Sequence, residues 1–170
     1  MMVTPGESSF DSLFRAEFPS VLRAAQVIVG DVELARDIAQ DAFTTLFVHW
    51  KKVSTYERPD AWVRRVAINA AIAQSKRRRR QRQIADAFER QRLGSEGRPI
   101  DDRLDPLFAA LGGLSAHQRA AVALFYLEDM PVSAVAGVMG TSESTVKVHL
   151  HRARHRLAEV LNEEVTDGPG

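Results

Sequence analysis

The stretch PVSAVAGVMGTSESTVKVHLHRARHRL, residues 131–157, decides the fold of the C-terminal half of this chain. Its first part places apolar residues at helical spacing, at Val132, Val135, Ala136 and Met139. Gly140 follows, and glycine readily adopts the left-handed conformation that a tight turn needs. Ser142 is a suitable N-cap for a second helix. The pattern therefore predicts a helix-turn-helix.

The second of these helices has two different faces. The spacing i, i+4, i+7, i+11 makes an inward apolar face of Val146, Leu150, Ala153 and Leu157. The outward residues are Glu143, Ser144, Lys147, Val148, His151, Arg152, Arg154 and His155. Small and basic residues at the start of such a helix can reach base edges in a major groove. An ordinary helical hairpin is the alternative interpretation.

A basic segment lies some fifty residues earlier in the chain. Residues 61–72 read AWVRRVAINAAI, and they are followed by Lys76, Arg77, Arg78, Arg79 and Arg80. Residues 51–82 carry 11 basic and 2 acidic groups, a net of +9, although the whole chain is only +1. Such a block suits a phosphate backbone. A solvated helix face or a disordered arm would give the same run of charge.

The remaining periodicity is helical, and no alternating strand pattern is convincing. We expect a helix from Phe10 to Gly30 that Pro19 kinks or splits, and a second, capped by Asp31, with Phe47 on its apolar face. Ser115 and Gln118 have the spacing of a capping box. The prediction is an all-α fold with two small helical domains, residues 10–82 and 106–161, joined by a flexible linker at 83–105.

Composition excludes several classes of function. The 170 residues contain no cysteine, so the chain has no disulfide or thiolate metal site. No apolar run approaches the roughly 20 residues of a membrane span. Residues 1–10 lack the features of an export signal, so we expect a cytoplasmic protein. There is no nucleotide-binding glycine loop and no nucleophile triad, so we expect neither an enzyme nor a cofactor.

Three residues on the second helix of the helix-turn-helix have the spacing of metal ligands. His151, His155 and Glu159 lie at i, i+4, i+8, which could ligate a metal. Outward histidines on a DNA-binding helix have a simpler use at phosphates, so we predict no metal.

Several segments resemble a known family. Leu114–Arg119, Phe125–Glu128, Ser144–Lys147 and Leu150–Arg154 look like region 4 of bacterial sigma factors, which binds the −35 promoter element. Asp37–Phe43 resembles the region 2 helix that docks on core RNA polymerase, and Trp62–Asn69 resembles the part that opens and reads the −10 element. With no other domain apparent, the chain is most similar to the extracytoplasmic-function sigma factors.

The resemblance implies three sets of site residues. Core polymerase would contact Asp37, Gln40, Asp41 and Phe43. The −10 element would meet Tyr56 by stacking, Asn69 as a base reader, and Arg64, Arg65, Lys76, Arg77, Arg78, Arg79 and Arg80 along its backbone. The −35 element would meet Arg119, Ser144, Thr145, Lys147, Val148, His151, Arg152 and Arg154. Tyr56 could instead pack, and we expect Trp62 in the core.

The chain departs from the family pattern within the helix-turn-helix. Pro131 stands where many relatives have a capping serine, and Gly137 replaces a common acidic residue. Val148 and His149 stand where relatives often carry Ser-Arg, on or beside the reading face, so the −35 preference is open.

The sequence thus predicts a transcription initiation factor with core RNA polymerase and promoter DNA as partners, and the resemblance implies an anti-sigma factor. Two alternatives stay open. One is a stand-alone, dimeric helix-turn-helix regulator that binds DNA without polymerase. The other is a protein in which only the C-terminal module functions.

Overall fold

The computed structural model describes residues 5–93 and 106–166. The elements in chain order are α1 (Pro5–Val29), α2 (Val32–Val48), α3 (Trp50–Val53), α4 (Pro59–Leu93), α5 (Pro106–Gly112), α6 (Ala116–Val122), the π-helical turn η1 (Ala123–Leu127), α7 (Val132–Met139) and α8 (Glu143–Thr166). No strand occurs in these two ranges, and the all-α prediction is confirmed. We call α1–α4 the N-terminal module and α5–α8, with η1, the C-terminal module.

The local signals act where the sequence places them. Asp31 caps α2, because its carboxylate accepts from the backbone N–H of Leu34 at 3.0 Å. Ser115 and Gln118 form the reciprocal capping box that starts α6. Gly140 ends α7 in the left-handed conformation, with φ 65°. These three positions fix the start of α2, the start of α6 and the turn of the helix-turn-helix.

Two details of α1 and α2 differ from expectation. Pro19 does not split the first helix, since α1 continues through it. Pro19 is exposed, so water can bond the carbonyl that the missing N–H leaves free. On α2, Phe47 was expected on the apolar face but is 59% exposed, whereas Phe43 is only 2% exposed. The rest of the buried face follows the helical spacing, and it consists of Ala35, Ile38, Ala39, Ala42, Phe43 and Leu46.

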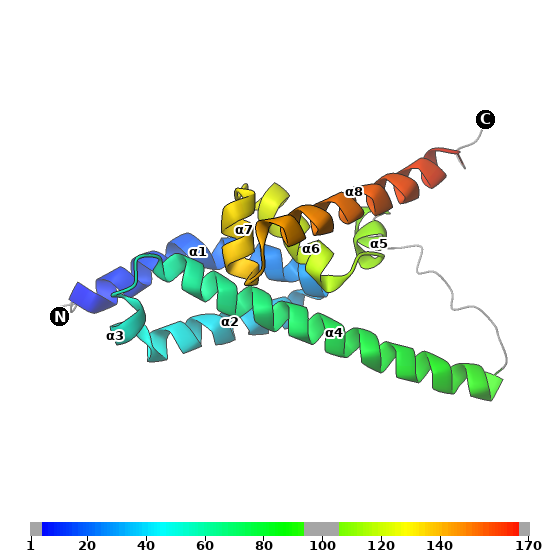
Figure 1. Cartoon of the computed structure of the whole chain (residues 1–170). Helices are drawn as coiled ribbons and strands as arrows, with labels where there is room; N and C mark the ends of the chain where they lie inside the picture. Colours follow the sequence, from blue (N-terminus) through cyan, green and yellow to red (C-terminus); the bar gives the residue numbers. More distant parts are fainter. Residues whose placement is uncertain (1–4, 94–105, 167–170) are drawn as a thin grey trace.

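The first part of the predicted linker continues the preceding helix. Helix α4 runs to Leu93, so residues 83–93 are helical and their end extends beyond the other helices (Figure 1). The rest of the predicted linker, residues 94–105, lies outside the described residues. Between α2 and α4 the chain also forms the one-turn helix α3.

The two modules share a core. Ile28 of α1 and Ile68 of α4 belong to the same buried cluster as Leu124 of η1, Val135 of α7 and Leu150 of α8. A second cluster, which includes Phe43 and Leu46, lies within the N-terminal module. The C-terminal module is thus packed directly on α1 and α4, and Figure 1 shows α6 and α7 beside these two helices.

Candidate nucleic-acid and partner interface

Helix α8 presents the face expected of a recognition helix. Its first turn is held by Ser142, whose hydroxyl accepts from the backbone N–H of Thr145 at 3.2 Å. Val146, Leu150 and Ala153 are buried as predicted. Six of the residues assigned to −35 contacts are exposed on the other side, and Thr145 is half-buried beside them; the six are Ser144, Lys147, Val148, His151, Arg152 and Arg154. The structure gathers these side chains on one accessible helix face, and their contact with DNA stays a prediction.

Arg119 was assigned to the same DNA surface, and the structure places it elsewhere. Its guanidinium is half-buried at the junction of the two modules. There it donates to the carbonyl oxygens of Ile28 at 2.8 Å and Leu114 at 2.5 Å, and to the hydroxyl of Ser75 at 2.6 Å. Burial lowers the pKa of Arg119, and the nearby Arg79 and Arg82 lower it further. With its donors turned inward, Arg119 is not available to DNA in this arrangement, and its contact with the −35 element stays a prediction.

The basic residues of α4 divide into covered and exposed groups. Arg64 forms an ion pair with Glu17 of α1 and contacts the sulfur of Met130, so its assignment to the DNA backbone is contradicted in this arrangement. Arg78 forms an ion pair with Asp31 at 3.2 Å. The exposed members of the predicted −10 surface on α4 are Arg65, Asn69, Lys76, Arg77, Arg79 and Arg80.

Two aromatic residues near the start of α4 differ in environment. Trp62 is half-buried, packs against the core of the N-terminal module, and has its ring centroid 6.3 Å from that of His49. The expectation that Trp62 serves packing is confirmed. Tyr56 lies exposed in the loop before α4, where its ring is accessible, and its stacking on a base stays a prediction.

The predicted polymerase-binding residues on α2 also divide. Asp37, Gln40 and Asp41 are exposed on the outer face of α2. Phe43 is buried among Phe14 and Phe18, with ring centroids 5.0 and 5.6 Å away. It therefore stabilises the N-terminal module and cannot contact a partner directly. That assignment is wrong, because the side chain falls on the buried side of α2.

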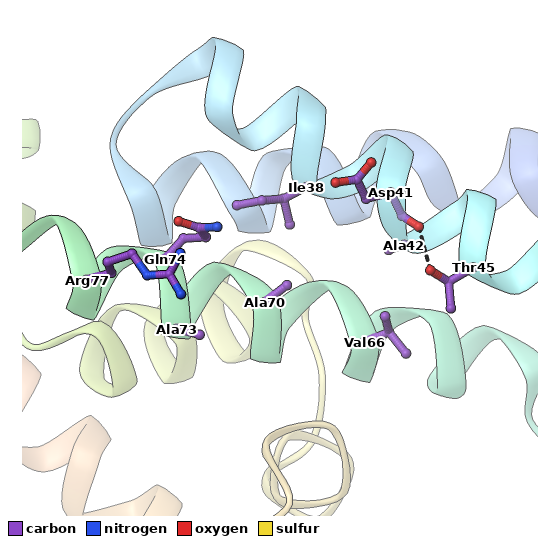
Figure 2. Close-up of a pocket in the computed structure, with 9 residues that line it drawn as sticks. All are labelled: Ile38, Asp41, Ala42, Thr45, Val66, Ala70, Ala73, Gln74 and Arg77. Carbon is purple, nitrogen blue, oxygen red and sulfur yellow. Dashed lines mark hydrogen bonds between the residues drawn. The ribbon is translucent and has the colours of Figure 1, made fainter.

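A groove of about 280 Å³ runs beside the acidic face of α2. Figure 2 shows Ile38, Asp41 and Ala42 of α2 on one wall and Val66, Ala70 and Ala73 of α4 on the other, with Arg77 near one end. The remaining lining residues are Thr45 and Gln74. The groove is mostly apolar, and its charged lining residues are Asp41 and Arg77. Such a groove suits a helix of a partner protein that carries both apolar and charged residues on one side. The sequence reasoning missed Ala70, Ala73 and Gln74, although small residues at i, i+3 on a helix are a signal for a groove.

A stacked histidine pair lies within the C-terminal module. The rings of His117 on α6 and His149 on α8 have centroids 5.7 Å apart and are nearly parallel, at 15°. Burial lowers the pKa of both, with Lys76 contributing for His117 and Arg152 for His149. Both rings are therefore harder to protonate than a free imidazole, and they pack α6 against α8.

The histidines considered for a metal do not form such a site. His155 pairs with Glu159 at 3.4 Å, and the ring centroids of His151 and His155 are 6.5 Å apart. Within residues 5–93 and 106–166, no cluster of three side chains is arranged to hold a metal ion. None of the helices in these ranges is both long and apolar enough to cross a membrane.

Comparisons with known proteins match both halves of the chain to one family. Residues 13–82 match the family model for sigma-70 region 2, and residues 104–157 match that for sigma-70 region 4. The chain is 31% identical to an RNA polymerase sigma-E factor of Streptomyces coelicolor over 158 residues, covering 89% of this chain and 85% of that protein. It is 24% identical to the ECF RNA polymerase sigma factor SigM of Bacillus subtilis, covering 94% of this chain and 99% of the relative.

The fold also matches a solved structure. The sigma factor RpoE of Bartonella quintana, crystallised with the anti-sigma factor NepR, superposes with a TM-score of 0.70. The match covers 91% of this chain and 98% of that one, at 24% sequence identity.

Proposed function

Since the chain belongs to the RNA polymerase sigma factors of the extracytoplasmic-function group, with regions 2 and 4 of the sigma-70 type, we propose a division of labour between its two modules. Residues 10–82 of the N-terminal module bind core RNA polymerase and open the −10 element. Residues 106–161 of the C-terminal module bind the −35 element. The segment from 83 to 105, which includes the end of α4, tethers these two parts. Sigma factors are initiation factors rather than enzymes, and we place this one in the cytoplasm, where polymerase works.

One observation carries the proposal: three chemically different surfaces occupy three helices. The exposed residues of α8 form a polar and basic face, those of α4 form a basic stripe, and those of α2 form an acidic face. A regulator that binds only DNA would use the basic faces of α8 and α4. The acidic face opposes DNA approach and suits a partner that presents basic residues.

Asp37, Gln40 and Asp41 supply this acidic face. The groove beside Asp41 places an apolar surface next to the Asp41 carboxylate. The polymerase segment that binds here therefore carries basic and apolar residues together. Asp41→Lys should then abolish binding to core polymerase while circular dichroism stays that of the wild type. Asp11→Lys on α1 is the matched control, because it makes the same change of charge at another exposed position of the module. If only the C-terminal module functions, Asp41→Lys leaves transcription intact.

The contacts with the −10 element and with the −35 element are each weak, and they give tight binding only when both form at once. Core polymerase fixes the separation of the modules, so that binding of one promoter element raises the effective concentration of the other module at its own element. Exposed Asn69 reads a base of the −10 element, Tyr56 stacks on an unpaired base, and Lys76, Arg77, Arg79 and Arg80 bind phosphates. On α8, the face from Ser144 to Arg154 reads the −35 element.

A partner that holds the factor inactive completes the proposal. The structural relative from Bartonella quintana was crystallised with an anti-sigma factor. We extend that kind of partner to this chain: its anti-sigma factor would cover the acidic face of α2 and the groove beside it, so polymerase could not dock.

Run-off transcription from genomic DNA fragments tests the function. Purified core RNA polymerase is assayed with and without this protein. New start sites that share spaced −35 and −10 elements are the expected result. If transcription does not change while the protein alone retards a DNA fragment, the stand-alone regulator replaces this proposal.

A further inference from the structure

The last part of α4 is an exposed helix that carries an apolar stripe. Within residues 81–92, which we call the tip of α4, every side chain is exposed except that of Asp86, which is half-buried. Ile84 and Phe88 are 62% and 73% exposed, although both are large apolar side chains. Figure 1 shows the tip extending beyond the other helices. Burial of such side chains is favourable, so the tip offers surface for a partner to cover.

The stripe on the tip continues the groove between α2 and α4. The residues of α4 that line this groove, drawn in order along the helix in Figure 2, are Val66, Ala70, Ala73, Gln74 and Arg77. Ile84 follows Arg77 by seven residues, and Phe88 follows Ile84 by four. Steps of seven and four keep side chains on one face of an α-helix. The face from Val66 to Phe88 is therefore continuous, and it is about 33 Å long.

The charges around the stripe are one-sided. Residues 76–92 carry eight basic and two acidic side chains, a net of +6. The helical repeat places the acidic residues, Asp86 and Glu89, away from the stripe. Arg80 and Arg92 each lie one helical turn from a stripe residue, so they flank the stripe. The face that a partner would meet is therefore apolar and basic.

Three kinds of partner fit this face poorly. A second copy of the chain would bring a second set of arginines against the first, and like charges repel. The phosphates of DNA pair with arginines but leave Ile84 and Phe88 in water. A lipid surface cannot follow the stripe into the groove, where α2 forms the opposite wall. A helix of another protein can lie along the whole stripe and offer apolar and acidic residues together.

We propose that the tip of α4 is a docking site for an amphipathic helix of a partner protein. This helix carries apolar residues along one side, with acidic residues beside them where it passes the tip. A helix of about 22 residues matches the length of the face from Val66 to Phe88. Residues 83–92 lie outside both segments that match the sigma-70 models, so the family match assigns them no contact.

A designed helical peptide tests this site. The split-charge peptide has about 22 residues, a leucine stripe, lysines in the half that would meet Asp41 and glutamates in the half that would meet the tip. The basic peptide has the same leucines with lysines throughout. Each peptide is labelled, and its affinity for the full chain is measured by fluorescence anisotropy at fixed salt. The split-charge peptide should bind about tenfold or more tightly than the basic peptide.

Loss of the apolar stripe should weaken this binding. Ile84→Gln with Phe88→Gln should lower the affinity for the split-charge peptide by about tenfold or more, because two buried side chains are lost from the interface. Leu161→Gln on α8 is the matched control, because it removes an exposed apolar residue of the C-terminal module. It should change the affinity by about twofold or less. Circular dichroism checks that both proteins keep the helix content of the parent chain.

A matched pair of arginines tests the charge. Arg92 flanks the stripe, whereas the helical repeat places Arg82 on the other side of the tip. Arg92→Gln should therefore weaken binding of the split-charge peptide more than Arg82→Gln does. Amide hydrogen exchange within residues 83–92 should also slow when the peptide binds. Equal affinity of the two peptides, or an affinity unchanged by Ile84→Gln with Phe88→Gln, overturns the proposal.

Other probes decide against the other occupants. Phosphatidylglycerol vesicles and a duplex DNA fragment are each titrated with the parent chain and with the Ile84→Gln, Phe88→Gln chain, and both proteins should bind them equally. A loss of vesicle or DNA binding in the variant would make the tip a lipid or nucleic-acid site and overturn the proposal. So would a dimer of the parent chain that the variant abolishes. None of these measurements uses polymerase, so failure of the docking site and failure of the proposed function are distinguishable.

Discussion

Arg64 on α4 forms an ion pair with Glu17 on α1 in which the two side chains are only 15% and 17% exposed. The same guanidinium contacts the sulfur of Met130 at 3.3 Å, and its Nε atom is buried without a partner. The partly buried charge of Arg64 depends on the carboxylate of Glu17, because that ion pair offsets the cost of removing the guanidinium from water. Arg64 therefore has a structural role within the folded chain.

Glu17→Gln should lower the free energy of unfolding by about 1–3 kcal/mol, since it leaves the Arg64 charge partly buried and unpaired. Glu33→Gln on α2 is the matched control, because that carboxylate is 81% exposed in its ion pair with Arg36. The control should change stability by about 0.5 kcal/mol or less. Urea unfolding of the full chain measures both, and equal losses would contradict the role given to Glu17.

Phe43 and Phe47 lie one turn apart on α2 and should respond very differently to truncation. Phe43→Ala should cost about 3–5 kcal/mol, because it empties a buried aromatic cluster. Phe47→Ala should cost about 1 kcal/mol, chiefly through the edge-on contact with Phe10 at 5.1 Å. The same urea titration compares them. A stable Phe43→Ala protein that fails only in polymerase binding would restore Phe43 as a contact residue.

The two glycines around α7 give opposite predictions for the same substitution. Gly140→Ala forces a side chain into the left-handed region at φ 65° and toward Arg65, so it should cost about 1–2 kcal/mol. Gly137 lies inside α7 with open space around its Cβ position, so Gly137→Ala should gain about 0.5–1 kcal/mol. Thermal melting of both variants checks the signs. Destabilisation by Gly137→Ala would show that α7 needs its glycine for a reason other than conformation.

We expect the free energy of unfolding to depend on pH through the stacked rings of His117 and His149. The pKa values of His117 and His149 are lowered by burial, from an ordinary value of 6.5, so the folded chain binds their protons less readily than the unfolded chain. Unfolding takes up protons in this range. The stability that the neutral pair contributes is therefore complete above pH 6.5 and lost as the pH falls through the lowered pKa values.

Thermal melting between about pH 8 and pH 5 should show a falling midpoint, and His117→Gln with His149→Gln should flatten that fall. The carboxyl groups of Asp31 and Asp60 do not interfere, because hydrogen bonds hold their pKa values below 3.8. A slope unchanged in the double variant would assign the pH dependence to other groups.

The elements that could be predicted from sequence are those governed by nearby residues. The caps at Asp31 and Ser115 involve partners three residues away, and the turn at Gly140 needs one glycine. The buried face of α8 follows from helical periodicity alone. The two caps, the turn and the buried face of α8 each depend on residues that are close together in the sequence.

What escaped prediction depends on distant partners. The hydrogen-bonded residues Ser75 and Arg119 are 44 residues apart, and Ser20 and Glu128, which also share a hydrogen bond, are 108 apart. The helical periodicity of the sequence does not reveal contacts between such distant residues. Arg64 and Arg119 were therefore predicted to be exposed cations on helix surfaces. Phe43 was misassigned for a related reason. Phe43 and Phe47 lie at i, i+4 on the same side of α2, and the sequence does not show which of the two the neighbouring helices bury.

On the proposed function, this chain needs core polymerase to bind a promoter tightly. Fluorescence anisotropy of one labelled promoter fragment, at fixed salt, compares the protein alone, core polymerase alone and the two together. Weak binding by the protein alone and tight binding by the assembled enzyme are the expected results. Equally tight binding by the protein without polymerase would contradict the proposed function.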